Sequence, residues 1–506
     1  MRYLKVVTII SVITCLWSCK NQQKEVEEQL DERPNIVVIY ADDLGYGDVS
    51  SYGSTELLTP NFDRIANEGI KFTNGYATSP TCTPSRYALL AGEYPFRRAK
   101  ARVLPGNAPL LFEVGKQTLP SMLHDAGYFT GVVGKWHLGL GDENLNWNAK
   151  VAPGPLEIGF DYSYIMASTN DRVPSVYVEN HSIVGLDIND PIEVSYKENF
   201  PGEPTGKENP EMLKMLFSHG HDMSVHNGIS RIGFQRGGKS ALFIDEDMSD
   251  DFLRESIKFV NDHKDEPFFL FYSLHQPHVP RVPHPRFAGK SGLGARGDVI
   301  VEADWAVGQF LDELDKLGLT ENTIVIFSSD NGPVLDDGYY DEAVTKIGKH
   351  TPRGGLRGGK YSLFDAGTHV PFMLRWPKEV SPGISNALVS QMDFTASFAA
   401  LLGQENKTRD SENILDAFTG KSQQGRTNLI LGQNNITAYR KGDYVLIPPH
   451  NGRKMTNKWV NIETGRDKEV QLYNLKEDRA QQYNLVSEYP EIVKAMLSEI
   501  DSIRKN

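Results

Sequence analysis

Four short apolar runs constrain the fold of this 506-residue chain more than any other feature. They cover residues 35–41, 129–134, 267–274 and 323–329 and are rich in β-branched and aromatic side chains. Continuous apolar runs of this length are typical of strands that are buried on both faces. Helix-like stretches lie between them, so we predict an α/β fold whose large, mixed, mostly parallel sheet is sandwiched between helices.

Polar or charged side chains follow each of these runs. Asp42 and Asp43 come directly after the first run, and the other three runs lead to Lys135 and His137, to His275 and His278, and to Asp330 and Asn331. Because open α/β sheets bind ligands at the carboxyl ends of their strands, we expect these groups to converge. Two adjacent buried carboxylates need a cation between them. The alternative for Asp42 and Asp43 is a solvated turn beside Gly45 and Gly47.

The expected cluster has an acidic half and a basic half. An all-oxygen set of ligands favours Ca²⁺ or Mg²⁺ over zinc, and that set would be Asp42, Asp43, Asp330 and Asn331. The cationic groups would be Lys135, His137, His278 and Lys360, which lies in a glycine-flanked basic loop. One hard metal ion beside several cations suits a doubly charged oxyanion or its ester, and therefore phosphoryl or sulfuryl transfer.

Cys82 is the one cysteine expected in the folded body, since Cys15 and Cys19 lie in the N-terminal leader. The pattern of residues 85–92, with a glycine at the end, predicts a helix that places Cys82 near its N-terminus. The N-terminus of a helix carries partial positive charge and free backbone N–H groups, so it is a favourable place for an anion. Cys82 can be a small buried apolar residue, as lone cysteines usually are, or the nucleophile that the hydrolysis needs.

Cys82, Pro84 and Arg86 fill the pattern Cys-x-Pro-x-Arg, and here the chain resembles the type I, formylglycine-dependent sulfatases of the alkaline phosphatase-like superfamily. The resemblance covers nearly all of residues 34–380 and part of the C-terminal region. Other family motifs follow in the same order as in the family: Asp42-Asp43, Gly134-Lys135-Trp136-His137, His278, Asp330-Asn331-Gly332 and Gly358-Gly359-Lys360. The family members that it resembles are bacterial polysaccharide sulfatases.

The resemblance implies a sulfuric ester hydrolase in which Cys82 is oxidised to formylglycine, whose hydrate supplies the attacking hydroxyl. It implies one Ca²⁺ held by Asp42, Asp43, Asp330 and Asn331 together with the modified Cys82. Arg86 would support the hydrate, and Lys135 and Lys360 would hold sulfate oxygens. His278, with Lys360, would protonate the departing sugar oxygen, and His137 would help to expel sulfate. The expected substrate contacts are Lys135, His278, Lys360, His275 and Arg172.

Residues 1–19 have the pattern of a targeting segment, in which Arg2 and Lys5 precede an apolar run that is too short to span a bilayer comfortably. Leu16–Cys19 resembles a bacterial lipoprotein cleavage box, so we predict a lipoprotein signal peptide with Cys19 lipidated. The alternative is an ordinary secretory peptide. The polar residues 20–33 are predicted to be a flexible tether. We expect an exported protein, either an outer-membrane or cell-surface lipoprotein or a periplasmic one.

The length of the chain favours two folded domains. We place a catalytic domain at residues 34–385, with the irregular stretch 141–245 as a substrate-specificity insertion. Residues 370–376 are predicted to be its last main strand and residues 387–402 a helix. Residues 386–506 are predicted to be a smaller C-terminal α+β domain. Its antiparallel strands would cover 434–448 and 470–475, and its helix 489–504.

The formal net charge of −13 argues against a nucleic-acid partner, so positive charge must be concentrated in one pocket if the substrate is a polyanion. The leading hypothesis is an exported sulfatase that acts on a sulfated polysaccharide or its oligosaccharides. Its other partners would be a formylglycine-generating or radical maturase enzyme and, through a lipid anchor, the membrane. The alternatives are a phosphoryl-ester hydrolase of the same superfamily and a catalytically inactive, glycan-binding surface lipoprotein. The sugar, the sulfated position and exo or endo action stay open.

Overall fold

A ten-stranded sheet forms the centre of the molecule, in the order β14-β2-β13-β12-β1-β11-β3-β4-β5-β6. The computed structural model describes residues 33–505. β13 and β5 run antiparallel to their neighbours, and the remaining pairs are parallel. The predicted mixed, mostly parallel sheet is therefore confirmed. Its strands are β1 (Asn35–Ala41), β2 (Ile70–Tyr76), β3 (Phe129–Lys135), β4 (Tyr162–Met166), β5 (Tyr177–Glu179), β6 (Ser182–Ile183), β11 (Phe268–Ser273), β12 (Thr323–Ser329), β13 (Phe372–Arg375) and β14 (Gly383–Ser390).

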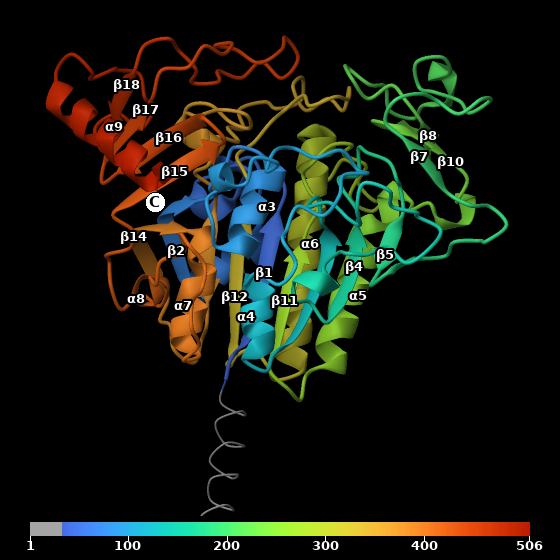
Figure 1. Ribbon diagram of the computed structural model, residues 1–506, viewed down its shortest axis with the longest axis horizontal. Coiled ribbons are helices and arrows are strands. Elements are labelled where there is room, and N and C mark those ends of the chain that lie inside the picture. Colours follow the sequence, from blue (N-terminus) through green and yellow to red (C-terminus); the bar gives the residue numbers. More distant parts are fainter. Residues whose placement is uncertain (1–32, 506) are drawn as a thin grey trace, which may run out of the picture.

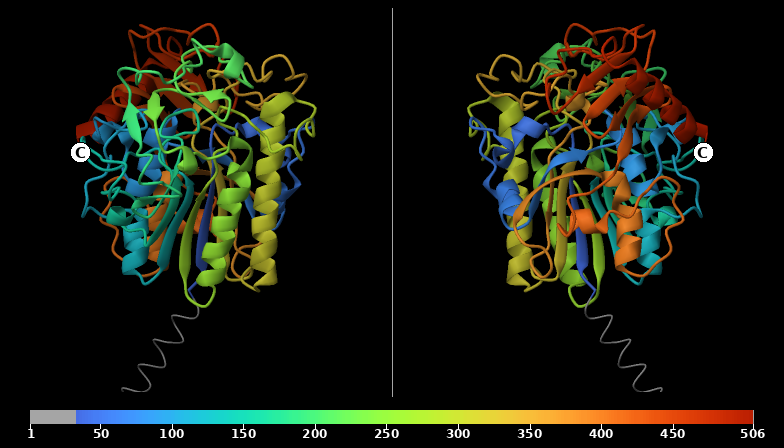
Figure 2. Two further views of the ribbon diagram at one scale, coloured as in Figure 1. Left: turned by 90° about the vertical axis from the view of Figure 1, so that its right-hand side faces the viewer. Right: turned by 90° about the vertical axis from the view of Figure 1, so that its left-hand side faces the viewer.

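Helices cover both faces of this sheet (Figures 1 and 2). Strand β1 shows why, because Ile36 and Val38 belong to one apolar core while Val37 and Ile39 belong to the other. The first core lies under α3 (Cys82–Ala91), α4 (Leu119–Asp125), α7 (Phe394–Leu401) and α8 (Leu415–Phe418). The second lies under α2 (Pro60–Asn67), α5 (Met248–Asp262) and α6 (Gly294–Lys316). A strand with apolar side chains on both faces requires this double cover.

A small antiparallel sheet with one long helix follows the large sheet, as the sequence predicts (Figure 1). It consists of β15 (Asn428–Gln433), β16 (Ile436–Lys441), β17 (Tyr444–Ile447), β18 (Gln471–Asn474) and α9 (Pro490–Lys505). Its apolar core includes Tyr76 and Ala88 from the large sheet region. The C-terminal unit is therefore packed against the part of the chain that surrounds Cys82.

Two edge elements differ from the sequence prediction. Residues 70–76 form strand β2, which the sequence analysis did not identify, and residues 383–390 form strand β14 where a helix from 387 was expected. The helix prediction is wrong for residues 387–390, and β14 runs across the boundary placed at 385. Strand β14 lies at the sheet edge, is exposed at its first residues and has an irregular register near Ser385. Such a strand lacks the continuous apolar run that identified the central strands.

The irregular stretch 141–245 contributes β4, β5 and β6 to the large sheet and continues in loops beside it (Figure 1). These loops contain two small antiparallel pairs, β7 (Glu193–Ser195) with β10 (Phe234–Arg236) and β8 (Val225–His226) with β9 (Ile229–Ser230). Single 3₁₀ turns are Tyr46–Asp48, Ser50–Tyr52, Pro95–Arg97, Leu156–Ile158, Pro210–Met212, Lys239–Ala241, Asp245–Asp247, Asp365–Gly367 and Gln391–Asp393.

The predicted signal peptide, the tether up to residue 32 and the lipidation site Cys19 lie outside the described residues. Among residues 33–505, none of the helices combines the length and the apolar character that crossing a bilayer requires.

A buried ion pair connects the 3₁₀ turn Tyr46–Asp48 to α6. The Asp48 carboxylate lies 2.7 and 2.6 Å from the two terminal nitrogens of Arg296, and it also accepts a hydrogen bond of 2.8 Å from His350 Nε2. Burial raises the pKa of Asp48, but Arg296 and His350 outweigh this effect and lower the pKa to about 2. Since the folded pKa lies below the ordinary value of 3.8, the pair stabilises the fold above pH 3.8.

We expect this contribution, about 2 kcal/mol of unfolding free energy, to be lost as the pH falls from about 4 to about 2. Asp48→Asn leaves Arg296 buried without a full counter-charge and should cost about 3 kcal/mol at neutral pH. Urea unfolding of both proteins across this pH range measures both effects. Asp265→Asn, at an exposed acid before β11, is the matched control and should change little. An unchanged unfolding free energy in the Asp48 variant would contradict the assignment.

Candidate active site

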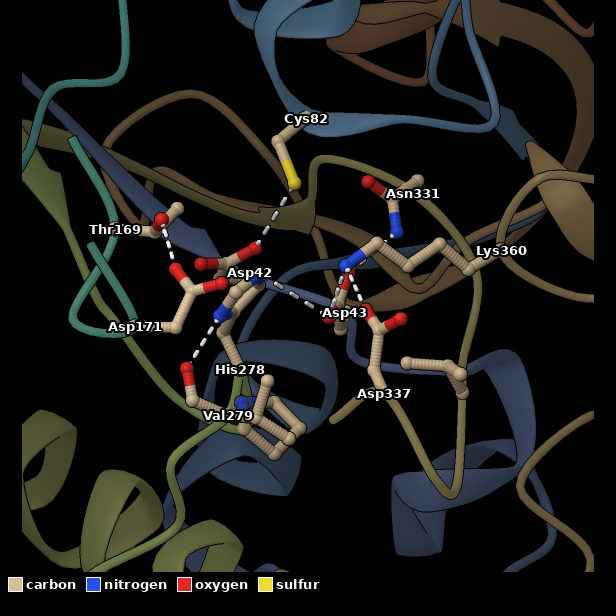
Figure 3. Close-up of polar contacts among 12 residues, drawn as sticks. Asp42, Asp43, Cys82, Thr169, Asp171, His278, Val279, Asn331, Asp337 and Lys360 are labelled. Carbon is tan, nitrogen blue, oxygen red and sulfur yellow. Dashed lines mark hydrogen bonds and ion pairs between the residues drawn. The ribbon is translucent and has the colours of Figure 1, made fainter. Parts of the chain in front are cut away.

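Four neighbouring parallel strands deliver the polar groups to one edge of the sheet. The strands are adjacent in the order β12-β1-β11-β3, and their carboxyl ends lie side by side. Asp42 and Asp43 follow β1, His278 follows β11, Lys135 ends β3 and Asp330 follows β12. The convergence that the strand pattern predicted is therefore present, and Figure 3 shows Asp42, Asp43 and His278 close together.

Three carboxylates form the acidic half of the cluster. Asp42, Asp43 and Asp330 are fully buried, and one oxygen of each lies within 4.8 Å of the others and of Cys82 Sγ. Asp43 has a left-handed backbone with φ of 63°, a conformation that is rare outside glycine and concentrates at functional sites. The amide of Asn331 donates a 2.7 Å hydrogen bond to Asp43 Oδ1. Within residues 33–505, Asn331 Oδ1 is buried and has no hydrogen-bond partner.

These oxygen donors fit a hard divalent cation. Hard cations prefer carboxylate and amide oxygens. Burial and then repulsion from Asp330 raise the pKa of Asp42 well above its usual range. Burial likewise raises the pKa of Asp43, even though Lys360 lowers it. An unpartnered amide oxygen beside repelling carboxylates is the environment that a cation would relieve.

Each of the three carboxylates is paired with one cationic side chain. Lys135 forms an ion pair with Asp42, Lys360 Nζ lies 2.8 Å from Asp43 Oδ2, and Arg86 Nε lies 2.9 Å from Asp330 Oδ2. Burial raises the pKa of Asp330, but the charges of Arg86 and Lys135 outweigh it and hold that pKa below its usual range. Asp330 is therefore the most firmly ionised of the three carboxylates.

Cys82 is the first residue of α3, so the predicted position near a helix N-terminus is confirmed. Its Sγ lies 3.6 Å from Asp42 Oδ1. Burial and then Asp330 raise the pKa of the Cys82 thiol well above its usual value. Because the thiolate is the reactive form of cysteine, this environment makes the unmodified thiol a poor nucleophile.

Arg86 lies one helical turn after Cys82 and is fully buried. Its Nη1 donates to Ser273 Oγ at 2.5 Å and to the Lys135 carbonyl at 3.3 Å, and its guanidinium lies 5.2 Å from the Tyr40 ring. Its Nη2 is buried without a partner in the described part of the chain. The guanidinium is therefore fixed in place, and its Nη2 remains available as a hydrogen-bond donor to a bound group.

His278 faces the carboxylates with its ring nitrogen Nε2. Its Nδ1 lies 2.7 Å from the Val279 carbonyl, which can only accept, so Nδ1 carries the proton. Nε2 lies 3.9 Å from Asp43 Oδ2. Burial and then Lys360 lower the pKa of His278 well below its usual value.

Asp337 is a site residue that the sequence analysis missed. Lys360 Nζ lies 2.8 Å from both Asp43 and Asp337, and Tyr361 donates to the same Asp337 carboxylate at 3.1 Å. Burial lowers the pKa of Lys360, but Asp337 and Asp43 outweigh it and raise the pKa well above its usual value. The only sequence signal was position, since Asp337 follows Asp330 by seven residues in the same loop.

The three remaining predicted residues lie at the border of the cluster. His137 Nε2 donates to the Leu104 carbonyl at 3.0 Å, and its Nδ1 is buried without a partner in the described residues. His275 packs edge-on against Phe252, and burial lowers its pKa to about 3. Arg172 pairs with Asp171 at 3.0 Å. The structure gives none of the three a direct contact with the carboxylate cluster among residues 33–505.

The sequence analysis did not single out Asp171 and His221. Both are buried, and Figure 3 shows Asp171 close to His278. His221 Nε2 lies 2.9 Å from Asp171 Oδ2, and Thr169 also donates to Asp171 (Figure 3). Burial raises the pKa of Asp171, but Arg172 and His221 outweigh it and hold the pKa well below its usual range. Their irregular loop gave no spacing from which this pairing could be predicted.

The fold and the site together define an α/β enzyme with a buried, charge-dense centre for an anionic ester. Buried lysines and an arginine can stabilise the charge that develops on an oxyanion. The Sulfatase family model matches residues 34–404, so the chain belongs to the sulfatase family, within the alkaline phosphatase-like superfamily. The predicted resemblance is confirmed, and the protein is a sulfuric ester hydrolase.

Individual relatives agree with this membership. Over 505 residues the chain is 46% identical to the N-acetylgalactosamine-6-O-sulfatase of Bacteroides thetaiotaomicron, a match that covers 99% of each chain. Human arylsulfatase A is 29% identical over 488 residues, which are 92% of this chain and 86% of that one. A solved structure concerned with the metabolism of multiple glycosaminoglycans by B. thetaiotaomicron has a TM-score of 0.92 at 47% identity. It covers 94% of this chain and 100% of that one.

Proposed function

We propose that this enzyme removes 6-O-sulfate groups from N-acetylgalactosamine units of a sulfated polysaccharide or its oligosaccharides. The similarity to the N-acetylgalactosamine-6-O-sulfatase supports this substrate, because it extends over 99% of each chain at 46% identity. The site supports an anionic ester, since Lys135, Lys360 and Arg86 bring three buried cations to one place.

We propose that Cys82 is the precursor of the nucleophile. The observation that carries this proposal is the position of its sulfur within 4.8 Å of three buried carboxylates, where the thiol itself is poorly reactive. Formylglycine made from Cys82 would supply, as its hydrate, a hydroxyl for attack on sulfur and a second hydroxyl for release of sulfate. A plain serine or cysteine ester of sulfate has no such internal route of release.

Calcium is the proposed metal, held by Asp42, Asp43, Asp330 and Asn331 beside the modified Cys82. The unpartnered Asn331 oxygen and the repelling carboxylates support this ligand set. When bound, a hard divalent cation supplies positive charge that stabilises the oxyanion formed in the reaction. A formylglycine-generating or radical maturase enzyme would be needed as a partner to modify Cys82.

The proposed roles of the basic groups follow from their contacts. Arg86 would support the hydrate with its spare Nη2 donor. Lys135 and Lys360 would bind sulfate oxygens. Both are held beside the proposed nucleophile, because they pair with Asp42 and Asp43, whose oxygens lie within 4.8 Å of Cys82 Sγ. His278 is oriented by Val279 and, when protonated at Nε2, would donate to the leaving sugar oxygen with help from Lys360.

His137, His275 and Arg172 would act around this centre. His137 Nδ1, which has no hydrogen-bond partner within residues 33–505, would accept the proton of the second hydroxyl as sulfate leaves. His275 and Arg172 are proposed as sugar contacts, Arg172 because its partner Asp171 fixes its guanidinium beside the site.

Sulfate release from defined sugars tests the substrate. We expect the mature enzyme to prefer N-acetylgalactosamine 6-sulfate over the 4-sulfate by about a hundredfold or more in kcat/KM, because a misplaced ester loses alignment with the nucleophile. Glucosamine 6-sulfate tests the sugar, and a phosphate monoester tests the phosphoryl alternative. Equal rates for the 4- and 6-sulfates would refute the assigned position. Faster phosphate release would favour the phosphoryl hydrolase.

We also propose that the protein is exported and anchored through a lipid on Cys19, at the outer membrane, at the cell surface or in the periplasm. The lipoprotein-like box at Leu16–Cys19 supports this proposal. Labelling of cells with a radioactive fatty acid should mark the wild-type protein, and Cys19→Ala should remove the label. A fully soluble, unlabelled wild-type protein would contradict the anchor.

A further inference from the structure

A cavity of about 780 Å³ lies between the loop that follows Asn331 and the loop that follows β17. Its volume is in the range of sites that bind small molecules. Residues 333–335, 351–357 and 458–463 provide most of its walls. Both loops lie at the end of the molecule where the site-bearing strands terminate (Figure 1).

One wall of the cavity belongs to the loop that carries Asp330 and Asn331 and that contacts the backbone of Lys360. Pro333 lines the cavity and follows Asn331 after one glycine, and its carbonyl accepts a 3.0 Å hydrogen bond from the Lys360 backbone. The same loop then supplies Asp337, the partner of Lys360. A ligand in the cavity would therefore lie next to the segment that positions Lys360.

The unbalanced charge in the cavity is positive. Glu463 is the one carboxylate among its lining residues, and Arg357 neutralises it with contacts of 2.7 and 2.9 Å. Arg353 and Lys458 also line the cavity, and neither is in an ion pair within the described part of the chain. In a chain with a net charge of −13, two uncompensated cations in one cavity favour an anionic ligand.

Trp459 connects this cavity to the loops of the 141–245 region. Its ring stacks on His219 with centroids 4.8 Å apart and planes 8° apart, and Lys458 Nζ lies 4.4 Å from the same ring. Ser218, beside His219, donates to Asp336 at 2.6 Å. Lys458 is thus held on a wall built from three separate loops.

We infer that this cavity is a subsite for an acidic sugar next to the sulfated unit, with Arg353 and Lys458 recognising its carboxylate or sulfate. The inference rests on the proposed function, because it names the neighbouring unit of the same carbohydrate. Rim cations raise association and lower KM without touching the reacting atoms. The cavity would therefore select acidic oligosaccharides over the single sulfated sugar.

The test compares three substrates that share a 6-sulfated N-acetylgalactosamine: the monosaccharide, an oligosaccharide with a neighbouring uronate and one with a neighbouring neutral sugar. We expect the wild type to have its lowest KM for the uronate substrate, and added salt should raise that KM. Lys458→Ala and Arg353→Ala should each raise it about threefold, and the double variant about tenfold, with kcat unchanged. The monosaccharide KM should not change.

Lys264→Ala is the matched control. This exposed lysine precedes β11 and therefore lies near the amino ends of the strands, opposite their carboxyl ends where the site is. The variant removes the same charge and should leave all three substrates unaffected. Equal wild-type KM values for the three substrates, or equal effects of the cavity variants on all of them, would overturn the subsite. No sulfate release by the wild type from any of the three would instead overturn the proposed function.

Discussion

Replacement of Cys82 by alanine is expected to lower the turnover of the sulfate ester by about 10⁴-fold or more, since it removes the proposed precursor of the nucleophile. The fold should be retained. Cys82 begins α3, but within residues 33–505 its side chain makes only one weak hydrogen bond, of 3.6 Å, to Asp42. Loss of this sulfur should therefore change the unfolding free energy by about 1 kcal/mol. Turnover and thermal unfolding of the same preparation measure both quantities.

Cys82→Ser separates a hydroxyl from an aldehyde hydrate. If the maturase leaves the serine unmodified, its oxygen can take the sulfuryl group once, but it has no second hydroxyl with which to release it. We expect at most a single turnover. Peptide mass spectrometry of wild-type protein from a host with the maturase should find an aldehyde or its hydrate at position 82. Fully active enzyme with an unmodified cysteine would refute the mechanism.

The sequence was sufficient for the centre of the fold because the central strands are buried on both faces. That burial produced the continuous apolar runs of β1, β11 and β12, and parallel pairing then forces their carboxyl ends to one edge. The meeting of Asp43 with Asp330 was therefore predictable without a structure. The edge strand β14 and its neighbour β2 were not, because β2 is only partly buried at three of its seven positions and β14 is exposed at its first residues and irregular in register.

The outer part of the site could not be predicted for a related reason. Asp171 and His221 lie 50 residues apart in loops without periodicity, and only the tertiary structure brings them within 2.9 Å. Asp337 lies on a loop whose path is fixed by backbone contacts such as that between Ser218 and Gly338. Chemistry at strand ends can be inferred from pattern, whereas pairings between long loops depend on packing that no local signal records.

Removal of the proposed calcium ion is expected to abolish catalysis and to weaken the fold. The site gathers Asp42, Asp43 and Asp330 with no exposure to water, and burial and mutual repulsion raise the pKa of Asp42 and Asp43. A cation that binds only the folded protein stabilises it by about 2.7 kcal/mol at a hundred times its Kd. Chelator-treated enzyme should therefore unfold at lower temperature, and added Ca²⁺ should restore both stability and sulfate release.

Two variants make this prediction specific to the proposed ligands. Asn331→Ala removes the unpartnered oxygen and should weaken calcium binding while the protein stays folded. Asp330→Asn should weaken it further and also destabilise the chelated protein by about 3 kcal/mol, because Arg86 then loses its buried counter-charge. Asp262→Asn, at an exposed acid at the end of α5, should bind calcium as the wild type does. Calorimetric titration gives each affinity. Full activity after exhaustive chelation, or recovery with zinc but not with calcium, would show that these oxygens serve another purpose.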